Sequence, residues 1–246
     1  MTCAGPARTA GPAQLAAVES TAMTGPKAAP RSNGQRERKP TTRATRRRDA
    51  LILDALERLL VETPLRDLGV EQIAEEAGIT RTRFYFYFKS KHEAYAALLA
   101  RVRDRLLVFY DTEDSWFQRP ESARPRESMT ATIRAVVDFW LEHGAVMREG
   151  ADLWNSVDEA RSLWHDLIHQ PVERMTRAIE RERRRGIAPD GPAADQLARN
   201  LIWHGERMLF LTLIDAPDAL AVDDLVESAT TVWMRAIYLA DDPPPS

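Results

Sequence analysis

The chain has 246 residues, 44% hydrophobic and 29% charged, which is typical of a globular protein with a sizeable core. No run approaches 18 apolar residues, which excludes a transmembrane helix, and the single cysteine, Cys3, excludes an intrachain disulfide. The formal charge of −3 is a sum of unlike parts: residues 1–50 carry +7, residues 51–95 carry −2 and residues 96–246 carry −8. A basic N-terminal part followed by an acidic C-terminal part suggests that the N-terminal part binds a polyanion.

Residues 1–45 are dominated by Ala, Pro, Thr, Gly and Arg and contain almost no large apolar side chains. Such a segment buries too little surface to offset its ordering entropy, so the composition predicts a disordered basic tail. The apolar patch from Ala13 to Val18 is too short for a signal peptide. We therefore expect a cytoplasmic protein without a membrane partner.

Three short helices are predicted next, within a domain of residues 46–95. The first starts near Arg47 and ends before Pro64, because the residue that precedes a proline is pushed out of the helical region. The second covers Val70 to Ala77 and is followed by Gly78, which suits a left-handed helix end. Thr80 is a suitable N-cap for the third. Two helices joined by so tight a turn indicate a helix-turn-helix.

The segment from Thr80 to Lys91 contains four cations and no acidic residue, interleaved with aromatic side chains. Cationic and short polar residues at the start of a recognition helix can contact phosphates and base edges. The alternation of Phe and Tyr over residues 84–88 also fits a β-strand, but the segment stands alone among helical patterns, so a helix is favoured.

These residues carry a family resemblance. The stretch Val70–Lys91, above all Ala77-Gly78-Ile79-Thr80 and the run Phe84-Tyr85-Phe86-Tyr87-Phe88-Lys89-Ser90-Lys91, resembles the TetR family of transcriptional regulators, and within it the EthR-like branch. One departure is Gly69, where members usually place Ser or Thr as N-cap, although glycine is acceptable there. The resemblance implies that DNA is contacted by Arg46, Arg47, Thr80, Arg81, Thr82, Arg83, Tyr85, Tyr87, Lys89 and Lys91.

The resemblance also assigns roles within this set. Tyr85 and Tyr87 should face the DNA backbone, whereas Phe84 and Phe88 should turn into the small core. Lys91, at the start of the next helix, should bind a phosphate.

Residues 96–246 are expected to form a second, wholly helical domain. A fourth helix begins after Ser90 and is long enough to leave the first domain, and a loop follows over residues 111–126. We expect Pro171 to kink one of the later helices. No segment has a strand pattern, so the predicted fold class is all-α. Helical patterns cover residues 127–143, 145–155, 157–185, 193–214 and 223–240.

All six tryptophans fall in this second domain. Large rings with a single N–H donor suit a mostly apolar small-molecule pocket, although each of them could equally fill the core of a helical bundle. The family resemblance implies a pocket for an apolar effector. The candidate ligand-binding residues are Trp116, Trp140, Trp154, Trp164, Asn200 and Trp203.

The expected function is that of a ligand-responsive transcriptional regulator, most simply a repressor, that binds a palindromic double-stranded DNA operator as a homodimer. The last two helices would pair across the two-fold axis, as the resemblance implies. An architectural or non-specific DNA-binding protein without an effector is the alternative. His165 and His169 have metal-ligand spacing but no further ligand nearby, so no metal or cofactor is expected, and no catalytic motif indicates an enzyme.

Overall fold

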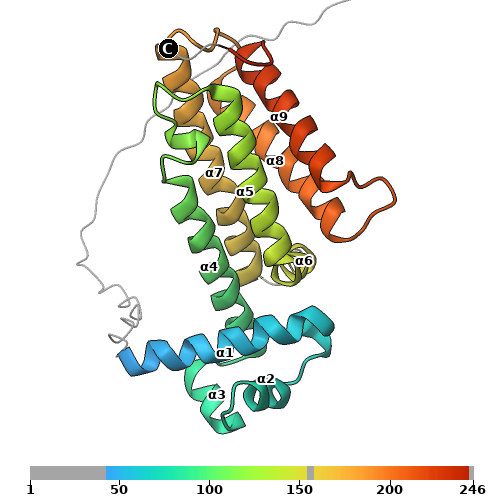
Figure 1. The fold of residues 1–246 in the computed structure, drawn as a ribbon. Coiled ribbons are helices and arrows are strands. Elements are labelled where there is room, and N and C mark those ends of the chain that lie inside the picture. The colour runs from blue at the N-terminus through green and yellow to red at the C-terminus, as the bar shows by residue number, and fades with distance from the viewer. Residues whose placement is uncertain (1–42, 154–157, 244–246) are drawn as a thin grey trace, which may run out of the picture. The chain divides into compact units, whose positions relative to one another are not determined.

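The computed structural model describes residues 43–153 and 158–243, apart from the side chains of residues 43–48, 152 and 158–160. The predicted tail, residues 1–45, lies almost wholly outside the described residues. All regular structure in the described part is helical, which confirms the all-α fold class (Figure 1).

The first part of the chain contains the predicted helix-turn-helix. Its helices begin and end within a few residues of the predicted bounds, and Pro64 follows the first of them. The run of alternating Phe and Tyr forms a helix, so the strand alternative is wrong. A 3-10 turn after Pro64 was not predicted. The elements are α1 (Arg43–Glu62), η1 (Leu65–Asp67), α2 (Val70–Glu76) and α3 (Arg81–Tyr87).

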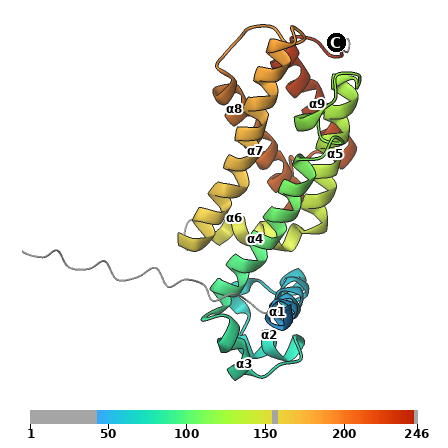
Figure 2. The same ribbon diagram turned by 90° about the vertical axis from the view of Figure 1, so that its left-hand side faces the viewer.

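The remaining helices form a bundle into which α4 leads directly from the helix-turn-helix (Figure 2). The last five predicted helices agree with the structure to within two residues at each end. A 3-10 turn interrupts the predicted loop, and α7 continues through Pro171. The elements are α4 (Lys91–Tyr110), η2 (Trp116–Gln118), α5 (Pro125–Glu142), α6 (Gly144–Leu153), α7 (Asp158–Arg184), α8 (Ala194–Leu213) and α9 (Val222–Tyr238).

Helix α4 packs both against the helix-turn-helix and within the bundle. Its buried face includes Tyr95, Leu98 and Val102, and it packs against α1 on one side and against α7 on the other. The apolar interior is therefore continuous from the helix-turn-helix into the bundle. None of the described helices combines the length and the apolar character needed to cross a membrane.

Candidate DNA-binding surface and effector cavity

The turn between α2 and α3 is closed by backbone hydrogen bonds. Gly78 has a φ of +66°, which a residue with a Cβ rarely adopts. The amide of Ile79 donates to the carbonyl of Ala74 at 2.9 Å, so the end of α2 is capped in the manner of a glycine-terminated helix. At the other end of α2, Gly69 is the N-cap, and its amide donates to Gln72 Oε1 at 2.7 Å. These contacts fix where α3 starts.

One face of α3 is anchored in the small core. Phe84 is fully buried and Phe88 is nearly so, and their ring centroids lie 5.9 Å apart. Both residues turn inward, in agreement with the prediction from the family resemblance. Phe84 within the helix and Phe88 at its C-cap therefore anchor one side of α3 and leave the opposite side free.

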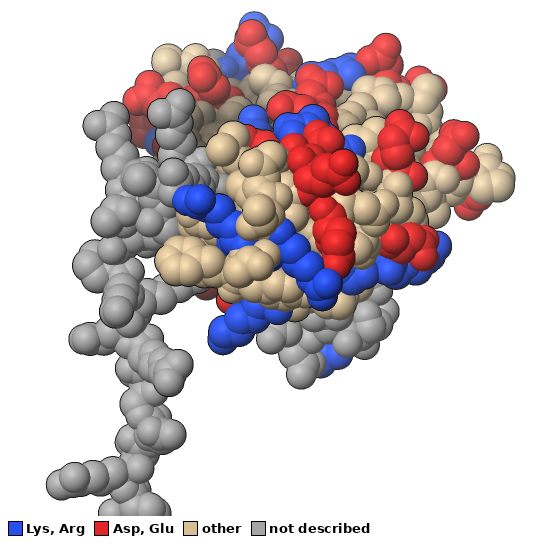
Figure 3. Space-filling model, turned by 90° about the horizontal axis from the view of Figure 1, so that it is seen from below, with Lys and Arg blue, Asp and Glu red and all other residues tan. Residues whose placement is uncertain are grey.

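The start of α3 is presented to solvent by its cap. Thr80 accepts a hydrogen bond from the amide of Arg83 at 3.3 Å, which confirms the predicted N-cap. Arg81, Thr82 and Arg83 in the first turn are exposed, as is Lys89 just after the helix. Figure 3 looks onto this face and shows Lys and Arg side chains across it, with acidic side chains beside them. The side chains of Arg46 and Arg47, in the first turns of α1, lie outside the described residues.

Arg81 is held by two neighbours. Its Nη1 atom lies 2.6 Å from Glu71 Oε1 on α2, and its guanidinium lies 5.6 Å from the ring centroid of Tyr85. The contact with the Tyr85 side chain and the charge of Glu71 together raise the pKa of Arg81, so it stays charged throughout the accessible pH range. Tyr85 is 44% exposed, so its hydroxyl is available at this surface.

Lys91 also has a structural role that the resemblance did not imply. Its Nζ atom donates to the carbonyl oxygens of Arg66 at 2.9 Å and Leu68 at 2.8 Å, so it closes the end of η1. One of its three N–H donors remains for a phosphate. The helix predicted to begin after Ser90 is α4, and Ser90 is its N-cap, accepting a hydrogen bond from the amide of Glu93 at 3.1 Å. Tyr87 is half-buried.

Phe86 is a surface residue that the sequence reasoning did not single out. It is 78% exposed and lies four residues after Thr82 on the same side of α3. The helical period supplied the signal, because residues 82 and 86 share a face of α3 that differs from the face of the buried Phe84. A large apolar side chain on this face can contact thymine methyl groups or sugars.

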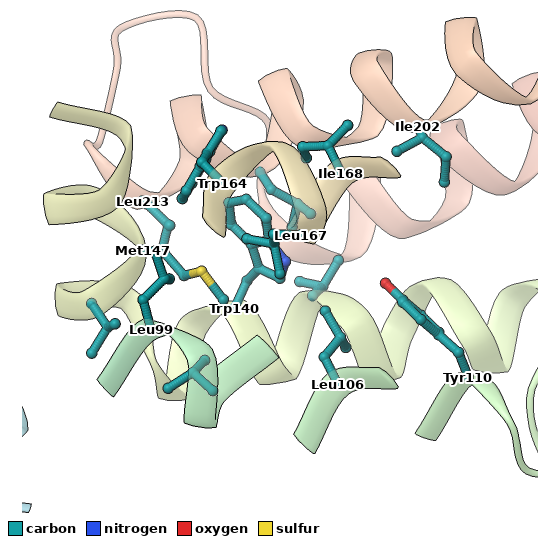
Figure 4. Packing of buried hydrophobic residues seen from close by; sticks show 14 of the residues in the cluster. Leu99, Leu106, Tyr110, Trp140, Met147, Trp164, Leu167, Ile168, Ile202 and Leu213 are labelled. Carbon is teal, nitrogen blue, oxygen red and sulfur yellow. The ribbon is translucent and has the colours of Figure 1, made fainter. Parts of the chain in front are cut away.

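The second site is a narrow apolar cavity of about 70 Å³ inside the bundle. Side chains from α4, α5, α7, α8 and α9 and from η2 line it. Figure 4 shows part of its wall, where the Tyr110 hydroxyl points from α4 toward the helices that carry Ile168 and Ile202, and Trp164 lies behind the lining residue Trp140.

Two polar groups at this cavity are buried without a hydrogen-bond partner within the described part of the chain. One is Glu206 Oε2 on α8 and the other is Trp233 Nε1 on α9. Burial raises the pKa of the Glu206 carboxyl above its usual range, against a smaller opposite effect of Arg207. Neither residue was among the predicted ligand contacts. Sequence periodicity placed them on helices but did not show what they face.

The predicted ligand-binding residues are dispersed. Trp140 lines the cavity, and Trp164 packs against it edge to face at 6.0 Å between ring centroids. Trp116 is fully buried elsewhere, where its Nε1 donates to the Tyr238 hydroxyl at 3.0 Å. The structure therefore brings only part of the predicted set together, and Trp154 lies outside the described residues.

The other two predicted contacts, both on α8, lie away from the cavity wall. Asn200 is exposed, and its Nδ2 donates to the Gln196 carbonyl at 3.0 Å. Trp203 is half-buried at a separate groove, beside His165 and His169.

Helix α6 joins the cavity to the helix-turn-helix. A Cβ on Gly150 would come within 2.8 Å of both the Trp164 ring and the Tyr95 hydroxyl, so this helix fits tightly between α7 and α4. The Tyr95 hydroxyl donates to the carbonyl of Val146 at 2.8 Å. On the same helix, Glu149 Oε2 accepts the backbone amide of Leu65 in η1 at 3.1 Å.

A second connection runs through His143, at the end of α5. Its Nδ1 lies 2.6 Å from Glu57 Oε1 on α1, and its Nε2 lies 2.9 Å from Arg105 Nη1 on α4. Because arginine can only donate, Nε2 must accept, which places the ring proton on Nδ1, facing the Glu57 carboxylate. Arg101 of α4 also pairs with Glu57, at 2.9 Å.

An exposed helix at the second position of a helix-turn-helix, joined through a tightly packed helix to a bundle with an apolar cavity, defines a helix-turn-helix DNA-binding regulator. The profile described as bacterial regulatory proteins of the tetR family matches residues 52–98, and that of the C-terminal domain of the transcriptional regulator EthR matches residues 129–239. The chain belongs to the TetR family and to its EthR-like branch, a family of DNA-binding transcriptional regulators rather than enzymes.

Similar proteins agree with this assignment. Over 196 residues the chain is 32% identical to the HTH-type transcriptional regulator EthR of Mycobacterium tuberculosis (strain ATCC 25618 / H37Rv), which covers 78% of this chain and 87% of the relative. The EthR of Mycolicibacterium smegmatis is 31% identical over 194 residues, covering 78% of this chain and 86% of the relative.

Solved structures share the fold at lower identity. A putative TetR-family regulator from Mesorhizobium loti aligns with a TM-score of 0.64 at 12% identity, covering 78% of this chain and 97% of that one. SmeT, the repressor of the Stenotrophomonas maltophilia multidrug efflux pump SmeDEF, aligns with a TM-score of 0.61 at 21% identity, covering 76% and 89%.

Proposed function

We propose that this regulator is a repressor that binds a palindromic operator as a homodimer through α3 and leaves it when a small apolar effector enters the bundle cavity. In this proposal residues 46–95 read DNA and residues 96–246 sense the effector and dimerise. The observation that carries it is the packed connection from Trp140 at the cavity, through Trp164 and α6, to the backbone of η1.

Recognition of DNA would rest on the exposed side of α3. Arg81 and Arg83 supply charge, Thr82 and Tyr85 supply hydroxyls, and Phe86 supplies apolar contact, all from one short helix. Contacts to phosphates would fix the register, and contacts to base edges would give sequence preference. The protruding start of a recognition helix suits entry into the major groove.

Dimerisation would supply the second half-site. One helix of seven residues contacts few base pairs, so a two-fold partner is needed to read a palindrome. The outer sides of α8 and α9 carry exposed apolar side chains that a second copy would cover, since Ile214 and Val232 are each 46% exposed. Met208 and Leu211 are half-buried beside them.

Release by an effector requires the cavity to change. Its volume of about 70 Å³ is well below the roughly 300–1,000 Å³ of ordinary small-molecule sites, so a larger effector has to push its walls apart. Trp140 is part of that wall, and Trp164 behind it is in close contact with Gly150 of α6. Displacement of α6 would move η1 and α1 and so change the distance between the two recognition helices of the dimer. The effector would favour the distance that belongs to its bound state.

The test is a titration of selected DNA against random DNA. Duplexes enriched from a random pool by the full chain should contain an inverted repeat, and affinity for them should exceed affinity for random duplexes by about 10³-fold or more. Light scattering should give the mass of a dimer at micromolar concentration. Equal binding to all duplexes would indicate the non-specific architectural protein instead, and a monomeric mass would contradict the two-fold arrangement.

A further inference from the structure

The cavity wall contains one acidic side chain. Among the residues that line it, Glu206 and Tyr110 are the only titratable groups, and Thr132 is the only other one with a polar side chain apart from the indoles of Trp140 and Trp233. The rest of the wall is aliphatic or aromatic. A carboxyl group in such surroundings is unfavourable unless something pairs with it.

Nothing in the described part of the chain donates a hydrogen bond to Glu206 Oε2. The residue is 5% exposed, and this oxygen is fully buried. The nearest cation is Arg207, whose Nη2 lies 3.9 Å away, too far for a hydrogen bond. The Arg207 side chain is itself 60% exposed and stacks over the Phe210 ring at 5.1 Å, so its charge is largely compensated by solvent.

We infer that Glu206 selects the effector and that the effector is an apolar molecule carrying a basic nitrogen. This inference rests on the proposed function and names the class of molecule to which the same cavity responds. An ammonium group would supply the missing hydrogen bond and a countercharge closer than Arg207, and the aromatic rings of Trp140 and Trp233 in the same wall attract cations. The Trp233 N–H, a donor, would take an acceptor oxygen on the same molecule.

Other head groups fit less well. A carboxylic acid would place a second acid beside Glu206, which disfavours the charged form of both. A neutral alcohol could donate one hydrogen bond, but it would leave the exposed Arg207, at 3.9 Å, as the countercharge of the carboxylate. A pure hydrocarbon would leave the oxygen unpaired, as it is now.

The pairing also sets a pH dependence. Burial favours the neutral acid in the free protein. An ammonium pairs with the ionised form, so affinity for an amine should rise as the pH increases through the pKa of Glu206. Arg207 on α8 and Tyr110 on α4 are its charged or titratable neighbours, whereas the lining residues of η2, α5, α7 and α9 have no titratable side chain. Burial raises the pKa of Tyr110, so it stays neutral.

The test uses three probes that share one apolar scaffold: 4-phenylbutylamine, 4-phenylbutanol and 4-phenylbutanoic acid. Each is titrated into the full-length protein by calorimetry at pH 5.5, 6.5 and 7.5, and each is then added to the complex with selected operator DNA. We expect the amine to bind about tenfold or more tighter than the alcohol at pH 7.5, to gain affinity with pH and to release the DNA. Tighter binding of the acid, equal binding of the three probes, or no binding of any would overturn the inference.

Two matched variants test whether Glu206 is the source of the preference for the amine. In Glu206→Gln the charge is removed at nearly constant shape, and the preference for the amine and its pH dependence should both disappear while the alcohol still binds. Glu180→Gln, at an exposed position on α7, should keep both. Retention of the amine preference in Glu206→Gln would also overturn the inference. Sequence-specific DNA binding is measured in the same samples, so failure of the repressor proposal would show separately as loss of operator preference.

Discussion

Ionisable side chains are exposed to solvent on α3, whereas the one acidic side chain in the wall of the bundle cavity is enclosed by apolar groups. On α3, Arg81 and Arg83 lie in solvent within one turn of helix, and their charges act at the surface. In the cavity, Glu206 is enclosed by side chains that come from helices far apart in the sequence. Charge on the first surface attracts a polyanion of any sequence. The Glu206 carboxyl in the second is shielded from water and lacks a hydrogen-bond partner for Oε2 within the described residues, so a small molecule that supplies one would be favoured.

This difference determines which properties of the protein a substitution at each site should alter. The α3 surface depends on a few local contacts that set the helix start, chiefly the Thr80 cap and the Gly78 turn. The cavity depends on packing across five helices, and that packing continues through α6 into the helix-turn-helix. Substitutions at the first should alter DNA affinity alone, whereas substitutions along the second should alter stability and effector response together.

The largest expected effect is on the DNA surface. Arg83→Ala should weaken operator binding by about 10- to 100-fold, because in the proposed complex this exposed cation in the first turn of α3 would contact a phosphate or a base edge. Fluorescence anisotropy with labelled operator measures the change. Arg177→Ala, which removes an exposed cation from α7, serves as the control and should leave affinity within about twofold. Equal losses in both variants would mean that overall charge, not α3, determines binding.

The next effect tests the connection through α6. Gly150→Ala places a Cβ within 2.8 Å of the Trp164 ring and the Tyr95 hydroxyl, so α6 has to shift. Overpacking of this kind costs about 1–3 kcal/mol, and a protein of this size would lose about 2–4 °C in Tm for each kcal/mol. Effector-induced release from operator should also change, because α6 lies between the two sites.

Gly191→Ala provides the comparison. A Cβ there would meet only Arg183 Nη2, at 3.4 Å, an ordinary contact at the end of a flexible side chain. Scanning calorimetry should show a lower Tm for Gly150→Ala alone. An unchanged melting temperature together with an unchanged effector response would show that α6 does not couple the cavity to the helix-turn-helix.

The sequence was sufficient to predict the helix-turn-helix because its determinants are local. Pro64, Gly78, Thr80 and Ser90 each act on the backbone within a few residues, and each lies at an element boundary in the structure. The helical period also separates the buried Phe84 from the exposed Tyr85. Lys91 shows the limit of this reasoning, because its bonds to the η1 carbonyls depend on a turn that was not predicted.

The cavity could be predicted only in part because its wall is assembled by tertiary packing. Trp140 and Trp116 look alike in sequence, yet one lines the cavity while the other is bonded to Tyr238 on a different side of the core. Asn200 and Glu206 lie on one helix at positions 6 residues apart, which corresponds to about 120° around its axis. The angular position of α8 in the bundle decides which of them faces inward, and no local pattern encodes that angle.

A smaller effect is expected at the contact between α6 and η1. Glu149→Ala removes the acceptor for the buried amide of Leu65, and an unsatisfied buried donor costs about 1–3 kcal/mol. Glu149→Gln keeps an acceptor oxygen and should retain most of the stability. Denaturant unfolding of both variants measures the difference. Equal destabilisation would show that the charge of Glu149, not its hydrogen bond, stabilises this contact.

The smallest expected effect is a gain in DNA affinity, at the pair between Arg81 and Glu71. Both side chains are 61% exposed, so the pair contributes little to folding, but the carboxylate competes with phosphate for the guanidinium and repels the DNA backbone. Glu71→Gln should strengthen operator binding by about two- to fivefold at low salt, with a smaller gain at high salt as screening increases. Glu75→Gln removes the same charge from an exposed position on the same helix. If release of Arg81 is the cause, only Glu71→Gln should strengthen binding, and the gain should vanish when Arg81 is also replaced by Ala; equal gains in the two glutamine variants would instead assign the effect to the net charge of α2.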